Sequence, residues 1–488
     1  MSGRWRFRLD RFGRALLAIV IIALTVRLGY VLVGKGGECL VTDPGTGEII
    51  SSPTDCPSGP EGQANDATYY NAAANLLARG EGMVDPFRPD REAADHPPLT
   101  VWVLTPVSWI GDNVVPAAVL DDLTNVFLHR LTMAVLGTAV VAVVGLIGKR
   151  VGGRRVGLVA AALAAIYPGL WISDALIFAE TVTNLAVVVT LLAALRAREA
   201  PTLKRFVVVG VGVGACALGR AELVLFVPLL AVALFDALRP GQRIRSLAAL
   251  GGATLLTLAP WVVYNNARFD RPTILSTNDG LALAASNCLP VYGGDTIGLT
   301  LYDAAPVDAP PEEKASDRYC IENPEPPGDQ SEVSAVYRSR ALRIMRDHLD
   351  QQPAVIAARV GRTWNVFRPF DMVWYNEGED REPWATRAAI WSFYPIAVAA
   401  MAGAFVLRRR DRSSGAQSGF GRILAVPLVS VTIASALTYG QARYRAVGEA
   451  ALVVLAAVAV DACVSARGAR RADVPEPTDV PEPTDVRA

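Results

Sequence analysis

The stretch ALLAIVIIALTVRLGYVLV, residues 15–33, decides the class of fold. It is an apolar run of the length that an α-helix needs to cross the hydrocarbon core of a bilayer, about 20 residues. The run is too long for the apolar core of a secretory signal peptide, and no small-residue cleavage site follows it closely. We therefore interpret it as a first transmembrane helix. It is preceded by five arginines: Arg4, Arg6, Arg8, Arg11 and Arg14.

The composition of the whole chain supports this class. Of 488 residues, 52% are hydrophobic and 19% are charged, whereas soluble domains carry about 25% charged residues. The mean hydropathy is +0.30. The formal net charge is zero, so net charge points to no charged partner, and we expect no binding to nucleic acid. The sequence predicts an all-α polytopic membrane protein whose surroundings are the lipid bilayer.

Basic residues fix the topology of the predicted spans. Lysine and arginine favour the cytoplasmic side of a membrane, and with ten spans every basic cluster falls on that side. After the N-terminal arginines, the clusters lie at residues 149–155, 196–205, 239–245, 408–410 and 467–471. The ten predicted spans are residues 15–33, 125–148, 156–172, 177–195, 206–219, 223–238, 247–264, 388–407, 423–439 and 447–464.

Two large outer loops follow from this topology, at residues 34–124 and 265–387. The apolar segment LTVWVLTPVSWIG, residues 99–111, is short for a span, so we predict an interfacial or re-entrant helix on the outer side. The tail repeats VPEPTD twice, and proline and acid at that density predict disorder. The predicted regions are an N-terminal transmembrane module at residues 1–264, the outer loop 265–387, the last transmembrane helices at 388–464 and a disordered cytoplasmic tail at 465–488.

Four of the six cysteines lie in the predicted outer loops. Cys39 and Cys56 share the first loop, and Cys288 and Cys320 share the second. Disulfides form and persist in oxidising compartments. We predict one disulfide within each loop; four free thiols are the alternative.

Several ionisable residues fall on the outer face of the predicted bundle, where a bilayer disfavours them. Arginines there oppose the general trend of basic residues towards the cytoplasm, and guanidinium groups bind phosphate through two parallel hydrogen bonds. Acids can accept a proton from a nucleophile. Solvated turns, and an acid placed at a helix N-terminus, are the structural alternatives. The residues are Asp174, Glu180, Arg220, Glu222, Arg443 and Arg445.

The first outer loop contains NDATYYNAAANLLARGEG, residues 65–82. Its apolar residues recur at helical spacing from Tyr69 onwards, which predicts a short amphipathic helix on the membrane surface. Glycines end the pattern. Asp66 stands at the helix start, where a helix cap is the alternative to a chemical role. His96 precedes a Pro-Pro pair that leads into the segment 99–111.

These stretches resemble the GT-C membrane glycosyltransferases, including the protein O-mannosyltransferases and the lipid A aminoarabinose transferases. The first loop, NDATYYNAAANLLARGEG followed by DHPPLT, is similar to the first outer loop of that family. The motifs YPGLWISDALIFAET, LGRAEL and ALTYGQARYR resemble its second acidic motif, its arginine turn and its closing motif. APWVVYNNARF and STNDGLALAASNCLPVYGG are similar to a bacterial branch. The first motif has Ala67 after Asp66, where many relatives carry two adjacent acids.

The resemblance implies an inverting glycosyltransferase in the plasma (inner) membrane. Asp66 would be the general base that deprotonates an acceptor hydroxyl, and the donor would be a sugar on a polyprenyl phosphate. Arg220, Arg443 and Arg445 would stabilise the departing phosphate. The resemblance also implies that Asp174 or Glu180 orients the acceptor or shares a divalent metal with Asp66 and His96. Further substrate-binding residues implied are His96, Tyr69, Tyr70 and Glu222.

Two other functions compete with this one. A flippase for lipid-linked glycans should show internal repeats and charges at mid-membrane, and neither is apparent in the sequence. A scaffold without catalysis is the second alternative. The sequence has no Walker motif and no zinc-type cysteine spacing. It leaves open whether the acceptor in the cell envelope is a glycan, a glycolipid or a protein.

Overall fold

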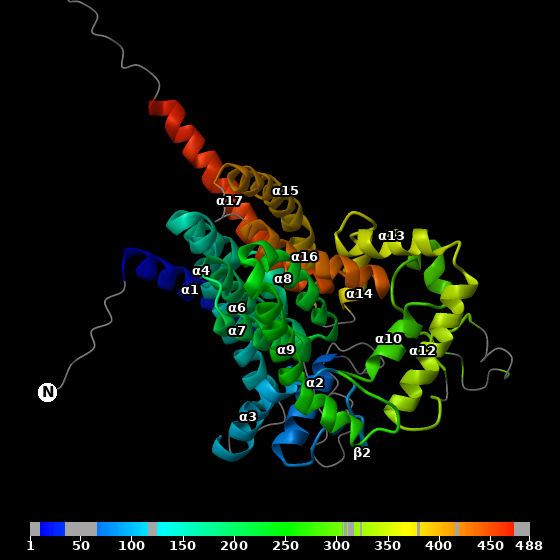
Figure 1. Ribbon diagram of the computed structural model, residues 1–488. Coiled ribbons are helices and arrows are strands. Elements are labelled where there is room, and N and C mark those ends of the chain that lie inside the picture. Colours follow the sequence, from blue (N-terminus) through cyan, green and yellow to red (C-terminus); the bar gives the residue numbers. More distant parts are fainter. Residues whose placement is uncertain are drawn as a thin grey trace, which may run out of the picture.

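The apolar runs of the sequence form helices that pack side by side in a bundle (Figure 1). The computed structural model describes residues 10–34, 66–115, 124–304, 306, 310, 317–322, 325–377, 381–414 and 419–472. Its two strands, β1 (Val84–Asp85) and β2 (Arg88–Glu92), form an antiparallel hairpin. Apart from this short hairpin the described elements are helices, so the predicted all-α membrane class is confirmed. The helices are α1 (Arg11–Gly29), α2 (Asp66–Ala78), α3 (Leu99–Val114), α4 (Thr124–Ile166), α5 (Pro168–Trp171), α6 (Ala179–Glu199), α7 (Leu203–Gly219), α8 (Phe226–Leu234), α9 (Arg243–Asn266), α10 (Asn278–Ala285), α12 (Gln330–Asp347), α13 (Gln352–Thr363), α14 (Asp371–Glu377), α15 (Pro383–Ser414), α16 (Phe420–Leu437) and α17 (Ala446–Ala472).

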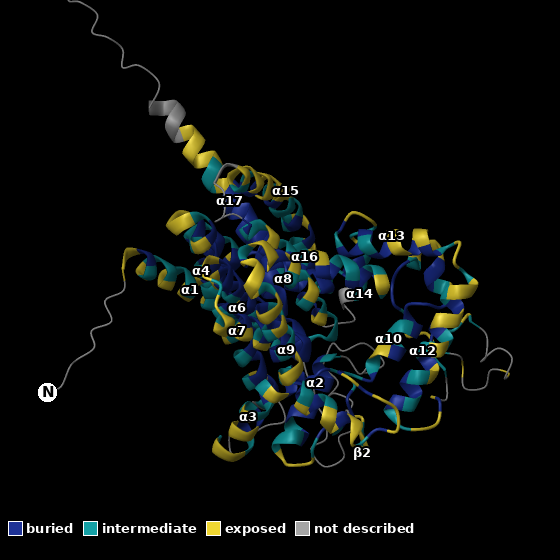
Figure 2. Cartoon of the chain, in the orientation of Figure 1, coloured by how far each residue is buried: buried dark blue, intermediate teal, exposed yellow. Residues whose placement is uncertain are grey.

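Helix α1 illustrates why these runs fold as spans. The carboxylate of Asp10 caps its first turn by accepting a hydrogen bond from the backbone nitrogen of Gly13 at 2.7 Å. Its lipid-facing side chains include Leu17, Ile21 and Ile22, which are about half exposed. A helix satisfies every backbone group internally, so such apolar side chains can face lipid without cost. Figure 2 shows that the bundle exposes its peripheral helices and buries the central ones, such as α6.

Within the described part of the chain, seven helices are long and apolar enough to cross a membrane: α1, α4, α6, α9, α15, α16 and α17. Helix α4 is a hairpin of two arms, because its backbone leaves the helical region at Gly152 and Gly153. The arms pack closely, since a Cβ on Gly148 would lie 3.0 Å from the Cα of Gly157. The first arm corresponds to the predicted span 125–148, and the second to the first part of the predicted span 156–172, whose end forms α5 instead.

The predicted cytoplasmic ends of the helices meet at one end of the bundle, which we name the basic end. There the start of α1, the turn of α4 and the end of α17 are joined by ion pairs, as are the ends of α6 and α8 and the start of α16. The pairs are Asp10–Arg154 (3.6 Å), Arg155–Asp461 (3.6 Å), Arg198–Asp236 (2.7 Å) and Arg422–Asp236. Helices α2 and α3 and the β-hairpin lie at the opposite end, the loop end (Figure 1).

Helices α7 and α8 also connect the two ends, because α7 begins near the basic end and both helices approach Arg220 at the loop end. They are shorter than the seven long helices, so the span count of ten stays a prediction. Helix α3 is likewise outside the seven, and its Trp102 and Trp109 are 38% and 53% exposed, which suits an interface.

The predicted boundary between the last transmembrane helix and the disordered tail, after residue 464, was wrong. Helix α17 continues to Ala472, so residues 465–472, which we assigned to a disordered tail, are helical. Their sequence, SARGARRA, is rich in alanine and arginine, which are strong helix formers. The rest of the tail lies outside the described residues.

The two outer segments are joined through Arg268, which follows α9. Its guanidinium group donates to the carbonyl oxygens of Met83 (2.6 Å) and Ala93 (2.5 Å) and stacks on the ring of Tyr264 at 4.3 Å. A backbone hydrogen bond from Thr277 to the oxygen of Ala94 adds a second link, at 2.8 Å. These contacts fix the strand-like segment that leads to His96.

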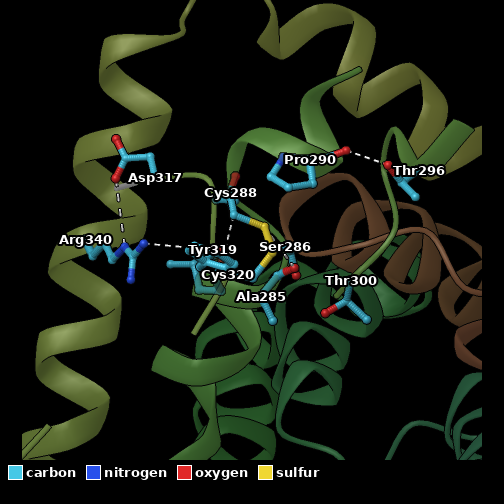
Figure 3. The surroundings of a disulfide bond; sticks show 12 residues. Ala285, Ser286, Cys288, Pro290, Thr296, Thr300, Asp317, Tyr319, Cys320 and Arg340 are labelled. Carbon is cyan, nitrogen blue, oxygen red and sulfur yellow. Dashed lines mark hydrogen bonds and ion pairs between the residues drawn. A yellow bond between two sulfur atoms is a disulfide. The ribbon is translucent and has the colours of Figure 1, made fainter. Parts of the chain in front are cut away.

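The second outer segment contains a disulfide between Cys288 and Cys320, the pair that we expected in this loop (Figure 3). Beside it, Arg340 of α12 donates to the oxygen of Tyr319 at 2.7 Å and faces Asp317. The bond therefore ties the loop after α10 to a region held by α12. Cys39 and Cys56 lie outside the described residues, and their pairing stays a prediction.

Candidate active site at the loop end

Asp66 is the first residue of α2, and the surroundings of α2 differ from our prediction. We expected a helix on the membrane surface, but Tyr69, Tyr70 and Ala74 are at most 3% exposed. The polar Asn71 is also turned inward, where its side-chain oxygen accepts a hydrogen bond from His129 of α4 at 2.9 Å. Since even its polar side contacts protein, α2 is a buried element of the loop end. It ends as predicted near Gly80, whose φ of +86° suits glycine.

Arg443 connects Asp66 to Glu180. Its Nε donates to Oε1 of Glu180 at 2.8 Å, and its Nη2 donates to Oδ2 of Asp66. Asp66 comes from α2, Glu180 from the first turn of α6, and Arg443 from the turn before α17. The side chain of Asp66 is 26% exposed, whereas that of Glu180 is fully buried. Three distant parts of the chain therefore meet in one charged group with a single partly open face.

A second arginine completes the surroundings of Glu180. Arg220 donates from Nη1 to the same Oε1 of Glu180 at 3.0 Å and from Nε to Glu222 at 2.6 Å. Its guanidinium group lies 4.6 Å from the ring centre of Tyr444. The structure thus brings together four of the six predicted outer-face residues, because Glu180, Arg220, Glu222 and Arg443 form one connected network.

His96 stands on the other side of Asp66. Its Nε2 lies 3.6 Å from Oδ1 of Asp66 and 3.3 Å from the carboxylate of Asp95. The rings of Tyr69 and Tyr70 flank the imidazole, with ring centres 4.8 and 5.2 Å away. The resemblance placed these residues at the substrate, and the structure groups them with Asp66.

The charges around Asp66 set its protonation state. Burial raises the pKa of Asp66, but Arg443 and His96 outweigh burial, and the net result is a pKa far below the usual range of a carboxyl group. Burial lowers the pKa of His96, but Asp95 and Asp66 outweigh it and the net pKa is raised. Asp66 is therefore held as a carboxylate, and His96 favours the imidazolium form beside it.

Two predicted residues lie outside this network. Asp174 accepts hydrogen bonds from Arg27 of α1 at 2.7 Å and from the hydroxyl of Thr181 at 2.8 Å, and it is 3% exposed. Of the two acids between which the sequence left the choice open, the structure joins Glu180 and not Asp174 to Asp66 through a shared partner. The carboxylate of Asp174 instead ties α1 to the start of α6.

Arg445 is the second such residue. It donates to Glu449 at 2.5 Å and to the backbone oxygen of Thr363 at 2.9 Å, and it lies over the ring of Phe393. Tyr167 also donates to Glu449, at 2.9 Å. Arg445 is thus paired inside the bundle rather than placed beside Glu180.

Arg381, which precedes α15, is a further residue of this region that we did not predict from the sequence. It is 5% exposed, and its guanidinium group faces the ring of Phe178 at 5.6 Å, the same ring that Arg443 faces at 5.0 Å. No pattern in the acidic sequence around Arg381 indicated a functional residue. Glu449 did carry a signal, because an acid within an apolar span is a functional or structural marker by default.

A cavity of about 40 Å³ lies between these groups. It has room for an ordered water. Asn365, 1% exposed and at a φ of +55°, has both side-chain polar atoms without a hydrogen-bond partner among the described residues. The polar residues that line the cavity are Ser173, Asn365, Arg381, Thr386, Arg443, Arg445 and Glu449.

Neither the comparison with protein families nor that with curated protein sequences gives a match. The apo oligosaccharyltransferase of Archaeoglobus fulgidus matches with a TM-score of 0.51 at 15% identity, covering 94% of this chain and 51% of that chain. The same archaeal enzyme, AglB, in complex with an inhibitory peptide and a dolichol-phosphate, gives 0.50 at 14% identity over 96% and 53%.

The chain has the GT-C fold. ArnT from Cupriavidus metallidurans, bound to undecaprenyl phosphate, also matches, with a TM-score of 0.37 at 14% identity over 95% of this chain and 80% of that chain. The predicted resemblance is confirmed for the fold. The chain spans about half the length of the archaeal oligosaccharyltransferase, so the activity of that whole enzyme does not transfer with the GT-C fold.

The divalent metal that the resemblance implied does not fit this GT-C site. The described residues contain no group of three or more histidine, cysteine, aspartate or glutamate residues arranged to hold a metal ion. Arg443 donates to one oxygen of Asp66 and to one oxygen of Glu180. A guanidinium group therefore stands between the two carboxylates.

Proposed function

We propose that this chain is a glycosyltransferase that moves a sugar from a polyprenyl-phosphate donor to a hydroxyl group of a cell-envelope acceptor, with inversion at the anomeric carbon. The observation that carries the proposal is the carboxylate of Asp66, partly open at the loop end of a GT-C fold and bordered by Arg443 and His96. The dolichol-phosphate bound to the archaeal oligosaccharyltransferase supports a lipid-phosphate donor.

In this proposal Asp66 is the general base. It takes the proton of the acceptor hydroxyl as that oxygen bonds to the anomeric carbon, and the bond from this carbon to the phosphate oxygen breaks on the opposite face. The electron pair of the broken bond leaves with the polyprenyl phosphate. Attack and departure on opposite faces invert the anomeric configuration.

The departing phosphate gains negative charge, which guanidinium groups stabilise. Arg443 is the group best placed for this, because it contacts Asp66 and also lines the cavity that Arg381 and Arg445 face. Arg220 acts from the far side of Glu180. Glu180 and Glu222 hold these two arginines in position and keep the local charge balanced.

His96, Tyr69 and Tyr70 form the acceptor side of the proposed site. The imidazole stands between two carboxylates and orients Asp66, while the two rings pack around it. Asp174 has a structural role in this scheme, through Arg27.

The proposed site faces the extracytoplasmic side of the plasma membrane. The arginine-rich basic end lies opposite the loop end, and lysine and arginine accumulate on the cytoplasmic side. Polyprenyl-phosphate sugars, in contrast to sugar nucleotides, can be presented on that outer face.

Transfer assays on an Asp66→Asn variant test the proposal. Asparagine keeps the shape of the side chain and caps helices as well as aspartate does, so the variant should fold and bind donor while its rate falls roughly 10²–10⁴-fold. Asp90→Asn is the matched control, because Asp90 is an exposed acid of the same outer region. The assay supplies the purified chain with labelled polyprenyl-phosphate sugars and identifies the label consumed.

Two results would contradict the proposal. One is near-normal transfer by the Asp66→Asn variant. The other is movement of intact labelled lipid across a vesicle membrane with no transfer to any acceptor, which would identify a flippase.

A further inference from the structure

The carboxylates of Asp66 and Glu180 share one positively charged group, and that group is a side chain of the protein itself, the guanidinium of Arg443. Arg443 reaches Asp66 through Nη2 and Glu180 through Nε. These two nitrogens lie on the same edge of the planar guanidinium group, so a single side chain bridges acids from two different helices. The other oxygen of Glu180, Oε2, is buried without a hydrogen-bond partner among the described residues.

The remaining charges leave no need for a second cation. Glu180 already contacts Arg220 as well as Arg443, and Asp66 has His96 on its other side. A divalent ion placed between the two carboxylates would lie against the guanidinium group of Arg443. Like charges a few ångströms apart in a partly buried site repel each other strongly, so the guanidinium group opposes binding of a metal ion there.

We propose that Arg443 is a built-in replacement for a divalent metal ion, so that the site works without a metal and acquires one only when Arg443 is removed. The inference deepens the proposed function at the same site. The guanidinium group supplies the positive charge beside the base and the departing phosphate, and its fixed plane orients both acids.

This arrangement has a chemical consequence. A metal ion binds and orients carboxylates but exchanges with solvent, whereas Arg443 is covalently held and stays charged at every working pH. Without Arg443, the oxygens left for a metal ion would be Oδ2 of Asp66 and Oε2 of Glu180, since Arg220 still donates to Oε1 of Glu180. Oxygen-rich sites of this kind suit Mn²⁺.

Binding of Mn²⁺ tests the inference without donor or acceptor. The wild-type chain, purified in detergent, is titrated with Mn²⁺ and the free ion is followed by electron paramagnetic resonance. We expect no stoichiometric binding to the wild type and no change of transfer rate on adding a chelator. Because the binding measurement needs no sugar transfer, failure of the inference and failure of the proposed function are distinguishable.

The Arg443→Ala variant should bind about one Mn²⁺ per chain, at least about tenfold more tightly than the wild type, since a full positive charge has been removed from between two acids. The second substitution Glu180→Gln should abolish that binding. Arg443→Lys keeps the charge and should not bind Mn²⁺. Arg338→Ala is the matched control, because Arg338 pairs with a lone acid, Asp279, and its removal frees only one carboxylate.

Two results would overturn the inference. The first is stoichiometric Mn²⁺ binding by the wild type that is lost in the Asp66→Asn variant, a measurement that decides the matter even if Arg443→Ala does not fold. The second is a folded Arg443→Ala variant, verified by circular dichroism, whose Mn²⁺ affinity equals that of the wild type.

Discussion

Arg443 donates a hydrogen bond to Asp66, a residue 377 positions earlier in the chain. The contact joins the first outer segment to the turn before α17, and so links the two ends of the chain at the loop end of the bundle. A contact over that sequence separation forms only when the helices between are packed. The geometry of the proposed site is therefore a property of the complete fold.

The shape of the Arg443 side chain should matter as much as its charge. Arg443→Lys keeps the positive charge but cannot present two donors on one edge to two carboxylates. We expect kcat to fall roughly 10²–10³-fold, the usual effect of removing a donor that stabilises developing charge, with donor affinity less affected. Transfer kinetics measure this. Arg338→Lys, at an exposed pair, is the control and should leave the rate unchanged; equal rates for the two variants would contradict the assignment.

The ion pair between Arg27 and Asp174 should contribute to stability rather than to chemistry. Both side chains are buried, at 1% and 4% exposure. Replacing one partner leaves an unpaired buried charge, at a cost of about 3–5 kcal/mol, whereas replacing both by apolar residues costs much less.

Thermal unfolding in detergent measures this difference. Arg27→Leu should lower the melting temperature clearly, and the Arg27→Leu, Asp174→Leu double variant should recover most of the loss. Folded Asp174→Asn protein should keep most of its transfer rate. A folded variant with a collapsed rate would return Asp174 to the catalytic residues.

Much of this arrangement was predictable from the sequence. Apolar runs and arginine clusters located the long helices and placed Asp66, Glu180, Arg220 and Arg443 on one face, because helix length and charge placement are set locally. The pairing of those side chains was not predictable. Asp174 and Glu180 are only six residues apart, yet their partners, Arg27 and Arg443, depend on which helices pack beside them.

Two other features could not be predicted from the sequence, for the same reason. Helix α2 has the pattern of a surface helix, and only its packing against α3 and α4 buries the polar side that carries Asn71. Arg381 stands in an acidic stretch without periodicity and reaches the site through the path of the chain before α15. Neither the pattern nor the composition of a segment encodes such contacts.

The two ends of the bundle should label from opposite sides of the membrane. Ser339 on α12 is exposed on the second outer segment, and Gln242 is exposed before α9 near the basic end. Cysteines are introduced singly at these positions in a chain whose exposed Cys463 is replaced by serine. A membrane-impermeant thiol reagent on intact cells should label Ser339→Cys but not Gln242→Cys. Labelling of Gln242→Cys alone would invert the proposed orientation.

The pH dependence of transfer should depend on Arg443. Asp66 acts as a base only as a carboxylate, so the rate falls on the acid side as pH drops through its pKa. In the wild type Arg443 and His96 outweigh burial and keep that pKa far below the usual value of about 4, so kcat/KM should show no acid limb near pH 4 or above. In Arg443→Met one of these opposing groups is gone while burial still raises the pKa of Asp66, and the acid limb should move up into the measurable range. Profiles of kcat/KM against pH report the free enzyme and measure this directly, with Arg338→Met as the control. Superimposable profiles for the wild type and Arg443→Met would show that the titrating base is not Asp66.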